Sequence, residues 1–293
     1  MKRRTPATRR STLLAASAML AAAGSAGPGS PSAAGQTLRY GVPSPPTATY
    51  HTADTIVSTA SMPTGEMATT VSTLSTLVLD FAQDPVGLRV TGTLANLEGT
   101  MSNPMMGSTP LPDLDVAGVF EFVMDHRGKV EIISMPEFPA VGMQMSPQSN
   151  MVQPLFPALP DGNLEPGTTW VDTTEVFPGM QFDALEAAMD ASSTTVTSYT
   201  LVGDTVFDGR TFLHIAVAGE VAIEGTMDLG GMEMVQSMAG TSRGLLLWDT
   251  ERGLVAFGHI SQEMQGTTEM GVMGTFGTTV TMSSHFRLDR LEN

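Results

Sequence analysis

The sequence predicts an exported all-β protein with a minor helical part, in which two related antiparallel meanders form a curved sheet or half-barrel. From Thr37 onward, apolar residues alternate with Thr and Ser at a period of two, and Gly, Asp and Pro interrupt this alternation at the spacing of turns. One hairpin pattern also occurs twice along the chain. Alternation at a period of two places successive side chains on opposite faces of a sheet, so we expect one apolar, concave face.

Residues 1–26 have the three-part form of an export signal. Five basic residues precede the apolar stretch 13–23, which is too short to span a bilayer permanently, and Gly24-Ser-Ala26 offers a cleavage site. We therefore expect export to the periplasm or the cell exterior, by the Sec or the twin-arginine route. Residues 27–37 are rich in Gly, Pro and Ser and predict a flexible linker.

The composition excludes several classes of function. The chain has 14 Lys and Arg residues and 30 Asp and Glu residues, a formal net charge of −16 at pH 7. Residues 1–26 hold five of the basic residues and none of the acidic ones, so nine basic residues face 30 acidic ones in the mature chain, a formal charge of −21. Such a surface repels phosphate backbones, and we expect no nucleic-acid partner.

The chain has no cysteine, so it lacks disulfides, thiolate ligands and a lipid-anchored cysteine. No later stretch predicts a membrane helix, so we expect a soluble protein.

The two meanders are expected at 38–139 and 170–293, with a Pro/Gly/Met-rich connection at 140–169. The pattern that occurs twice is an apolar strand, an Asp, an Arg-Gly turn and a second strand, at Gly118–Val130 and Gly244–Val255. A looser match relates Leu77–Gly99 to Tyr199–Gly225, and each segment ends in Glu-Gly. Near 180–191, the spacing of three apolar residues predicts a short helix that covers the apolar face as a lid; they are Phe182, Leu185 and Met189.

The segment before Trp170 carries a resemblance to a known family. The string Leu159-Pro-Asp-Gly-Asn-Leu-Glu-Pro-Gly-Thr-Thr-Trp170 resembles the Leu-Pro…Val…Gly-(Asp/Glu)-(Ser/Thr)-Trp signature of an uncharacterised family of secreted bacterial β-proteins. Thr168 replaces the usual acidic residue, and Leu164 replaces Val. That family is similar to the half-barrel periplasmic lipoprotein carriers (LolA-like). The resemblance implies a half-barrel and a role in handling lipid, and it supplies no catalytic residue.

The sequence contains none of the common catalytic motifs. It has no Gly-x-Ser-x-Gly elbow, no phosphate loop and no His-Glu-x-x-His string, and its five histidines lack metal-ligand spacing. We therefore expect no catalytic residue, no metal site and no cofactor. An enzyme would need the fold to bring distant groups together, for instance His214 and His259 beside an acidic residue.

Methionine is unusually abundant, with 22 residues, many of them in clusters. Flexible Met side chains form adaptable apolar surfaces, and we expect the protein to bind or carry a hydrophobic, lipid-like molecule without catalysis. The predicted apolar contacts are Trp170, Phe182, Leu185, Met189, Met232, Met234 and Met238. One alternative is a structural or interaction module of the cell envelope with a protein partner. Another is copper(I) binding by the thioethers of Met232, Met234 and Met238.

Overall fold

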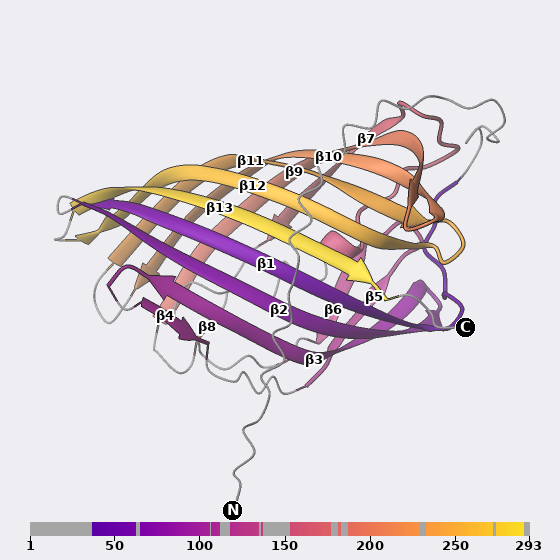
Figure 1. Cartoon of the computed structure of the whole chain (residues 1–293), viewed down its shortest axis with the longest axis horizontal. Helices are drawn as coiled ribbons and strands as arrows, with labels where there is room; N and C mark the ends of the chain where they lie inside the picture. Colours follow the sequence, from indigo (N-terminus) through magenta and orange to yellow (C-terminus); the bar gives the residue numbers. More distant parts are fainter. Residues whose placement is uncertain are drawn as a thin grey trace, which may run out of the picture. The chain divides into compact units, whose positions relative to one another are not determined.

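Thirteen β-strands account for most of the structure (Figure 1). This computed structural model describes residues 37–62, 65–105, 107–111, 118–134, 136, 153–176, 181–182, 187–228, 233–271 and 274–289, and all of them lie within the compact unit Ala33–Asn293. The strands of the first half are β1 (Thr47–Met62), β2 (Gly65–Asp84), β3 (Gly87–Asn103), β4 (Gly107–Pro110), β5 (Phe120–Met124) and β6 (Val130–Ser134). Those of the second half are β7 (Thr169–Val176), β8 (Gln181–Phe182), β9 (Ala187–Phe207), β10 (Arg210–Asp228), β11 (Glu233–Asp249), β12 (Leu254–Met270) and β13 (Gly274–Leu288).

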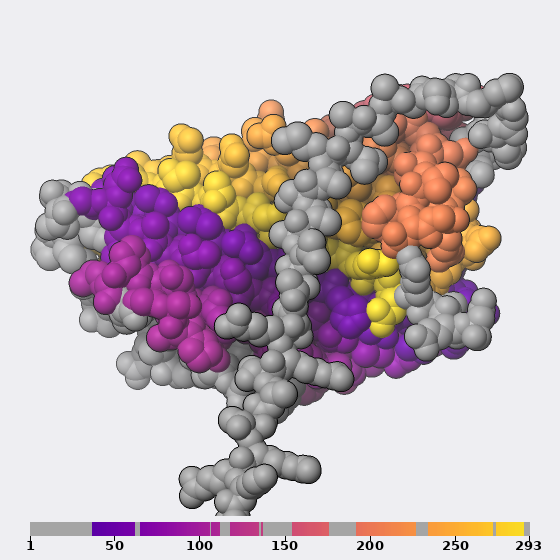
Figure 2. All heavy atoms as spheres, viewed as in Figure 1, coloured from indigo at the N-terminus to yellow at the C-terminus, as the bar shows by residue number. Residues whose placement is uncertain are grey.

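All the strand pairs are antiparallel, and they form one open sheet in the order β6-β5-β3-β2-β1-β13-β12-β11-β10-β9-β7. Strand β4 pairs with β3, and β8 pairs with β9, outside this path. The first and last long strands lie side by side, with Tyr50 opposite Leu288 and Ser61 opposite Gly277. Figure 2 shows this seam, where the indigo surface of β1 meets the yellow surface of β13. The predicted all-β class is therefore confirmed, and β1 with β13 joins the two meanders into one sheet.

The two halves repeat the same order of pairing. In the first half β1, β2, β3, β5 and β6 pair in succession, and in the second half β7, β9, β10, β11 and β12 do so. The hairpin pattern that occurs twice in the sequence forms β5–β6 and β11–β12, and the looser match forms β2–β3 and β9–β10. Among the strands of the described residues, β13 has no counterpart in the first half, and it links β12 to β1.

The two matching hairpin turns are held by equivalent aspartates. The Asp125 carboxylate accepts hydrogen bonds from the backbone N–H groups of Arg127 (2.8 Å) and Lys129 (2.9 Å). The Asp249 carboxylate accepts them from the N–H groups of Glu251 (3.0 Å) and Arg252 (3.2 Å). These are the bonds by which Asp stabilises a tight turn.

The segment 153–168 packs against the strands at one end of the sheet. After the 3₁₀ turn η1 (Gln153–Leu155), it buries four apolar side chains among those of the strands, and they are Leu155, Phe156, Leu159 and Leu164. We call the cluster that these four side chains form with the buried strand residues around them the end core. The ring centroid of Tyr40 lies 5.1 Å from that of Trp248 and 5.7 Å from that of Phe156, in edge-to-face contacts. The described part of the connection between the meanders, from residue 153 onward, thus contributes to the core.

The short helix predicted near 180–191 is wrong over the residues that the structure describes. Gln181–Phe182 form β8, which pairs with Ala188 and Ala187 at the start of β9, and Met189 continues β9. Leu185 lies outside the described residues. The apolar spacing of three and four residues competes here with pairing to β10, where Met189 lies opposite Met227. Pairing with a long neighbouring strand outweighs a weak local helix signal.

Glycines allow adjacent strands to approach each other closely in the second half of the sheet. A Cβ atom on Gly240 would lie 2.0 Å from the carbonyl oxygen of Glu263, and one on Gly266 would lie 1.9 Å from that of Ser237. No side chain fits at such distances, so glycine at these positions lets the adjacent strands lie closer together than any other residue would.

Candidate ligand-binding face

The two faces of the sheet differ in chemistry along the long strands. We call the face that carries the end core the inner face. On β13, Phe286, Met282 and Val280 point inward, and Thr281 and Thr279, which alternate with them, are exposed. The alternation predicted from the sequence therefore produces one apolar face and one Thr/Ser-rich face.

Along β10 and β13, the burial of the inner side chains decreases with distance from the end core. Along β10, Leu213 and Ile215 are 1% and 0% exposed, Val217 and Val221 are still buried, and Ile223 is half-buried. Along β13, Phe286 is buried whereas Met282 and Val280 are half-buried. The buried parts are the start of β10 and the end of β13, where the strand residues share one core cluster with those of segment 153–168.

A second apolar cluster lies on the inner face beyond the end core. We call it the Met cluster; its buried members are Val221, Met238 and Met264, and its half-buried members are Ile223, Val280 and Met282. Register places these residues on four adjacent strands, with Ile223 opposite Met238 and Met264 opposite Val280. The flexible thioether side chains suit an apolar surface that adapts to its ligand.

Between the end core and the Met cluster, the inner face carries a polar belt formed by Thr52, Asp54, Ser75 and Ser284. The hydroxyl of Thr52 donates to Asp54 Oδ2 at 3.3 Å and lies 2.7 Å from that of Ser75. Burial raises the pKa of the Asp54 carboxyl, and hydrogen bonds from Ser284 and Thr52 partly oppose this rise. No sequence motif distinguishes Asp54 as a site residue, and the only signal is that it lies in phase with Tyr50 and Ile56 on β1.

The predicted apolar contacts fall in different places. Trp170 belongs to the periphery of the end core, where its indole N–H donates to the Ala158 carbonyl at 2.7 Å and its ring stacks on Tyr199 at 5.5 Å. Met238 lies in the Met cluster, and Met234 lies half-buried on the same face of β11.

The copper hypothesis concerns Met232, Met234 and Met238. Met232 lies outside the described residues, and the sulfur of Met238 accepts a hydrogen bond from the Gln236 amide at 3.0 Å. Copper binding stays a prediction.

The fold does not bring His214 and His259 together. They lie on β10 and β12, and β11 separates these strands, with Leu247 opposite His214 and Leu245 opposite His259. His259 instead stacks on His285. Over the described part of the chain, no three His, Asp or Glu side chains are placed to hold a metal ion.

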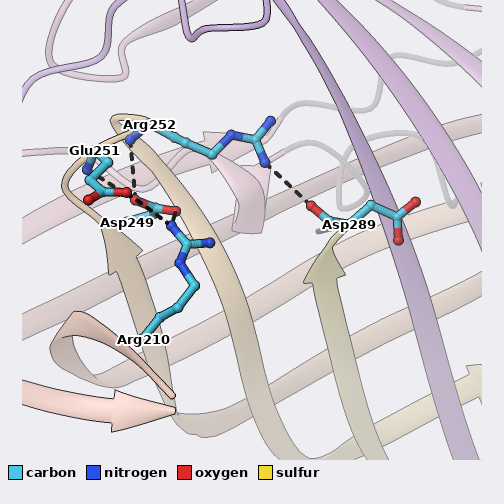
Figure 3. Close-up of polar contacts among 5 residues, drawn as sticks. All are labelled: Arg210, Asp249, Glu251, Arg252 and Asp289. Carbon is cyan, nitrogen blue, oxygen red and sulfur yellow. Dashed lines mark hydrogen bonds and ion pairs between the residues drawn. The ribbon is translucent and has the colours of Figure 1, made fainter. Parts of the chain in front are cut away.

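A charged cluster surrounds the β11–β12 turn at the edge of the end core (Figure 3). Arg210 donates to the buried Asp249 carboxylate at 2.8 Å, and the Arg252 guanidinium donates to the backbone carbonyls of Asp289 (3.4 Å) and Thr47 (3.3 Å). The cavity beside these residues has a volume of about 30 Å³, and Phe207, Phe257 and Arg287 also line it. A cavity of this size holds one or two water molecules, so it is no site for a lipid.

Neither a family model nor a curated protein sequence matches the chain. Among solved structures, the outer membrane protein opdK from Pseudomonas aeruginosa aligns with 83% of this chain and 99% of its own, at 6% identity and a TM-score of 0.22. OpdK with vanillate and OccK1 (OpdK), from the same organism, align at 8% identity with TM-scores of 0.21 and 0.20. At such scores the likeness carries no argument about fold or function. Within the described residues, no helix has the length and hydropathy of a membrane span.

Proposed function

We propose that this protein is an exported, non-catalytic envelope protein that binds a hydrophobic, lipid-like molecule on the inner face, at the Met cluster. The observation that carries the proposal is the decrease in burial along the inner sides of β10 and β13. The chain supplies its own apolar cover, segment 153–168, at one end of the sheet. At the other end, Met282, Val280 and Ile223 stay half-buried although the sequence pattern places them on the apolar side.

The ligand would be held by apolar area. Burial of apolar surface contributes roughly 25 cal/mol per Å², so contact along several strands suffices without any decisive polar residue. The Met cluster spans β10 to β13, and the apolar row continues in register onto β1 and β2, where Ile56 lies opposite Met282 and Val71 lies opposite Ile56. An alkyl chain laid across these strands would cover this surface.

Native mass spectrometry of the mature protein, purified from its own envelope, tests the proposal. We expect a bound mass that organic extraction identifies as a lipid. A clean apo mass, together with no uptake of added lipid, contradicts the proposal. A copper adduct in place of lipid, lost on replacement of Met232, Met234 and Met238, would support the copper alternative.

The second candidate is an interaction module, and the end strand β6 favours it. Ile132 and Ile133 on this strand are 58% and 49% exposed. In the described residues β6 pairs only with β5, and an unpaired strand edge with exposed apolar side chains can accept a strand from a partner. Self-association or partner binding that is lost in Ile132→Lys, with Val86→Lys as the control at another exposed site, would favour this candidate.

A further inference from the structure

Asp54 occupies a defined place between the two apolar clusters of the inner face. It lies on β1 opposite Ser284 of β13 and Thr73 of β2. Two residues further along β1, Ile56 lies opposite Met282, a member of the Met cluster. A chain-like molecule that rests on the Met cluster and extends toward the end core therefore meets the Asp54 carboxylate.

The charge of this part of the inner face has one sign. Residues that lie opposite each other on successive strands form rows across the sheet. Four such rows cross this part of the inner face, and they pass through Val217, Gly219, Val221 and Ile223 of β10. In the described part of these rows, the ionisable side chains on the inner side other than tyrosine are Asp54 and Asp172, and both are acidic. Arg243 and Arg287 lie on the outer side of their strands.

Asp54 has hydroxyl partners and forms no ion pair with a described residue. Burial raises the pKa of its carboxyl, although the nearby His285 lowers this pKa in part. A half-buried carboxylate that is left without a counter-charge is costly, and a cation that arrives with a ligand would offset this cost.

We propose that the inner face selects amphiphiles with a protonated amine headgroup, which pairs with Asp54 while the alkyl chain covers the Met cluster. This inference rests on the proposed function and adds the chemical class of the ligand. The belt hydroxyls of Thr52 and Ser284 hydrogen-bond to this carboxylate. An anionic headgroup at the same position would face Asp54 directly and be repelled.

A set of probes with one alkyl chain and three headgroups tests the inference: dodecylamine, dodecanol and dodecyl sulfate, below their micelle concentrations, by isothermal titration calorimetry on the mature protein. We expect dodecylamine to bind about tenfold more tightly than dodecanol, and dodecyl sulfate more weakly still, because a charge-assisted hydrogen bond to a buried carboxylate has about this effect. In Asp54→Asn, which keeps the shape of the side chain, amine and alcohol should bind alike. Glu263→Gln, which removes a carboxylate from the outer side of β12, should leave the tenfold ratio unchanged.

The outcomes separate this inference from the proposed function. If no probe binds, the proposed function fails. If the three probes bind equally, or if Asp54→Asn keeps the preference for the amine, the hydrophobic face stands and the selectivity by Asp54 is wrong. Thermal unfolding of each variant by circular dichroism shows that the fold is retained and makes the comparison valid.

Discussion

His259 and His285 lie opposite each other on β12 and β13, and their imidazole rings stack with centroids 4.0 Å apart and planes at 25°. Burial lowers the pKa of His285, the nearby His259 lowers it further, and Asp54 raises it in part. A protonated imidazole is therefore less favourable here in the folded protein than in the unfolded chain.

This stack predicts that stability falls in mild acid. Because the folded pKa of His285 is lowered, the unfolded chain takes up the proton first as the pH falls through about 6.5, its ordinary pKa. The free energy of unfolding should then decrease until the pH is below the folded pKa, with no effect of this group above about pH 7.5. Urea unfolding between pH 5 and 8 measures this slope, and His285→Gln should reduce it.

Two other groups contribute to the same titration. Burial also lowers the pKa of His214, so its effect has the same sign and persists in His285→Gln. The raised pKa of Asp54 has the opposite sign, because the folded protein takes up that proton first and gains stability as the pH falls. The difference between wild type and His285→Gln isolates the stack. An unchanged slope in this variant would show that the stack does not control the pH dependence.

The buried carboxylate of Asp249 should be worth more than its counterpart Asp125. Both accept two backbone hydrogen bonds in their turns, but the Asp249 side chain is only 2% exposed and also pairs with Arg210. We expect Asp249→Ala to lower the free energy of unfolding by about 2–4 kcal/mol and Asp125→Ala by about 1 kcal/mol. Denaturant unfolding checks this, and equal losses would show that the ion pair adds nothing.

Gly240 should not tolerate a side chain, because a Cβ atom there would lie 2.0 Å from the carbonyl oxygen of Glu263 and 2.6 Å from the Cα of Met264. We expect Gly240→Ala to cost about 2–3 kcal/mol of stability through forced separation of β11 and β12. Gly277→Ala, where the new Cβ would lie 3.9 Å from the Cβ of Ser61, is the control and should change stability by about 0.5 kcal/mol or less. A small loss in Gly240→Ala would mean that the two strands can separate without cost.

Phe156 should anchor the segment that covers the end core. Its ring contacts those of Tyr40, Phe81 and Phe122 at centroid distances of 5.7, 6.2 and 5.5 Å, and it is 3% exposed. We expect Phe156→Ala to lower the free energy of unfolding by about 3–5 kcal/mol. Met105→Ala, at an 84% exposed position, should have almost no effect in the same urea titration. A loss below 1 kcal/mol for Phe156→Ala would contradict the packing role of the segment.

The sequence allowed the fold class to be predicted because local patterns determine it. Alternation at a period of two specifies strands, and the Asp and Gly residues at 125, 128, 249 and 253 specify two turns that depend on local hydrogen bonds and on positive φ angles of 89° and 65° at the glycines. The pairing of β1 with β13 joins residues more than 200 positions apart, and no local pattern encodes it. The short helix was predicted from apolar spacing alone, and the pairing of β9 with β10 replaced it.

The candidate site was only partly predictable. Met238 was identified from the density of methionines, whereas Met264 and Met282 joined it through strand register that the sequence does not display. Asp54 lies among Thr and Ser residues on β1 and stands out only when the inner face is known. Trp170 was expected at the ligand, but its hydrogen bond to Ala158 and its stacking on Tyr199 place it at the end core.

The most direct test of the inner-face account compares two neighbouring positions on β13. Met282 points into the Met cluster and Thr281 is exposed on the outer side, so Met282→Lys and Thr281→Lys place the same charge on the same strand but on opposite faces. The measurement is the lipid retained by each purified variant in native mass spectrometry, with folding checked by circular dichroism. The account predicts that Thr281→Lys retains as much lipid as wild type and that Met282→Lys, still folded, loses it. Equal retention by the two folded variants would contradict ligand binding at the Met cluster.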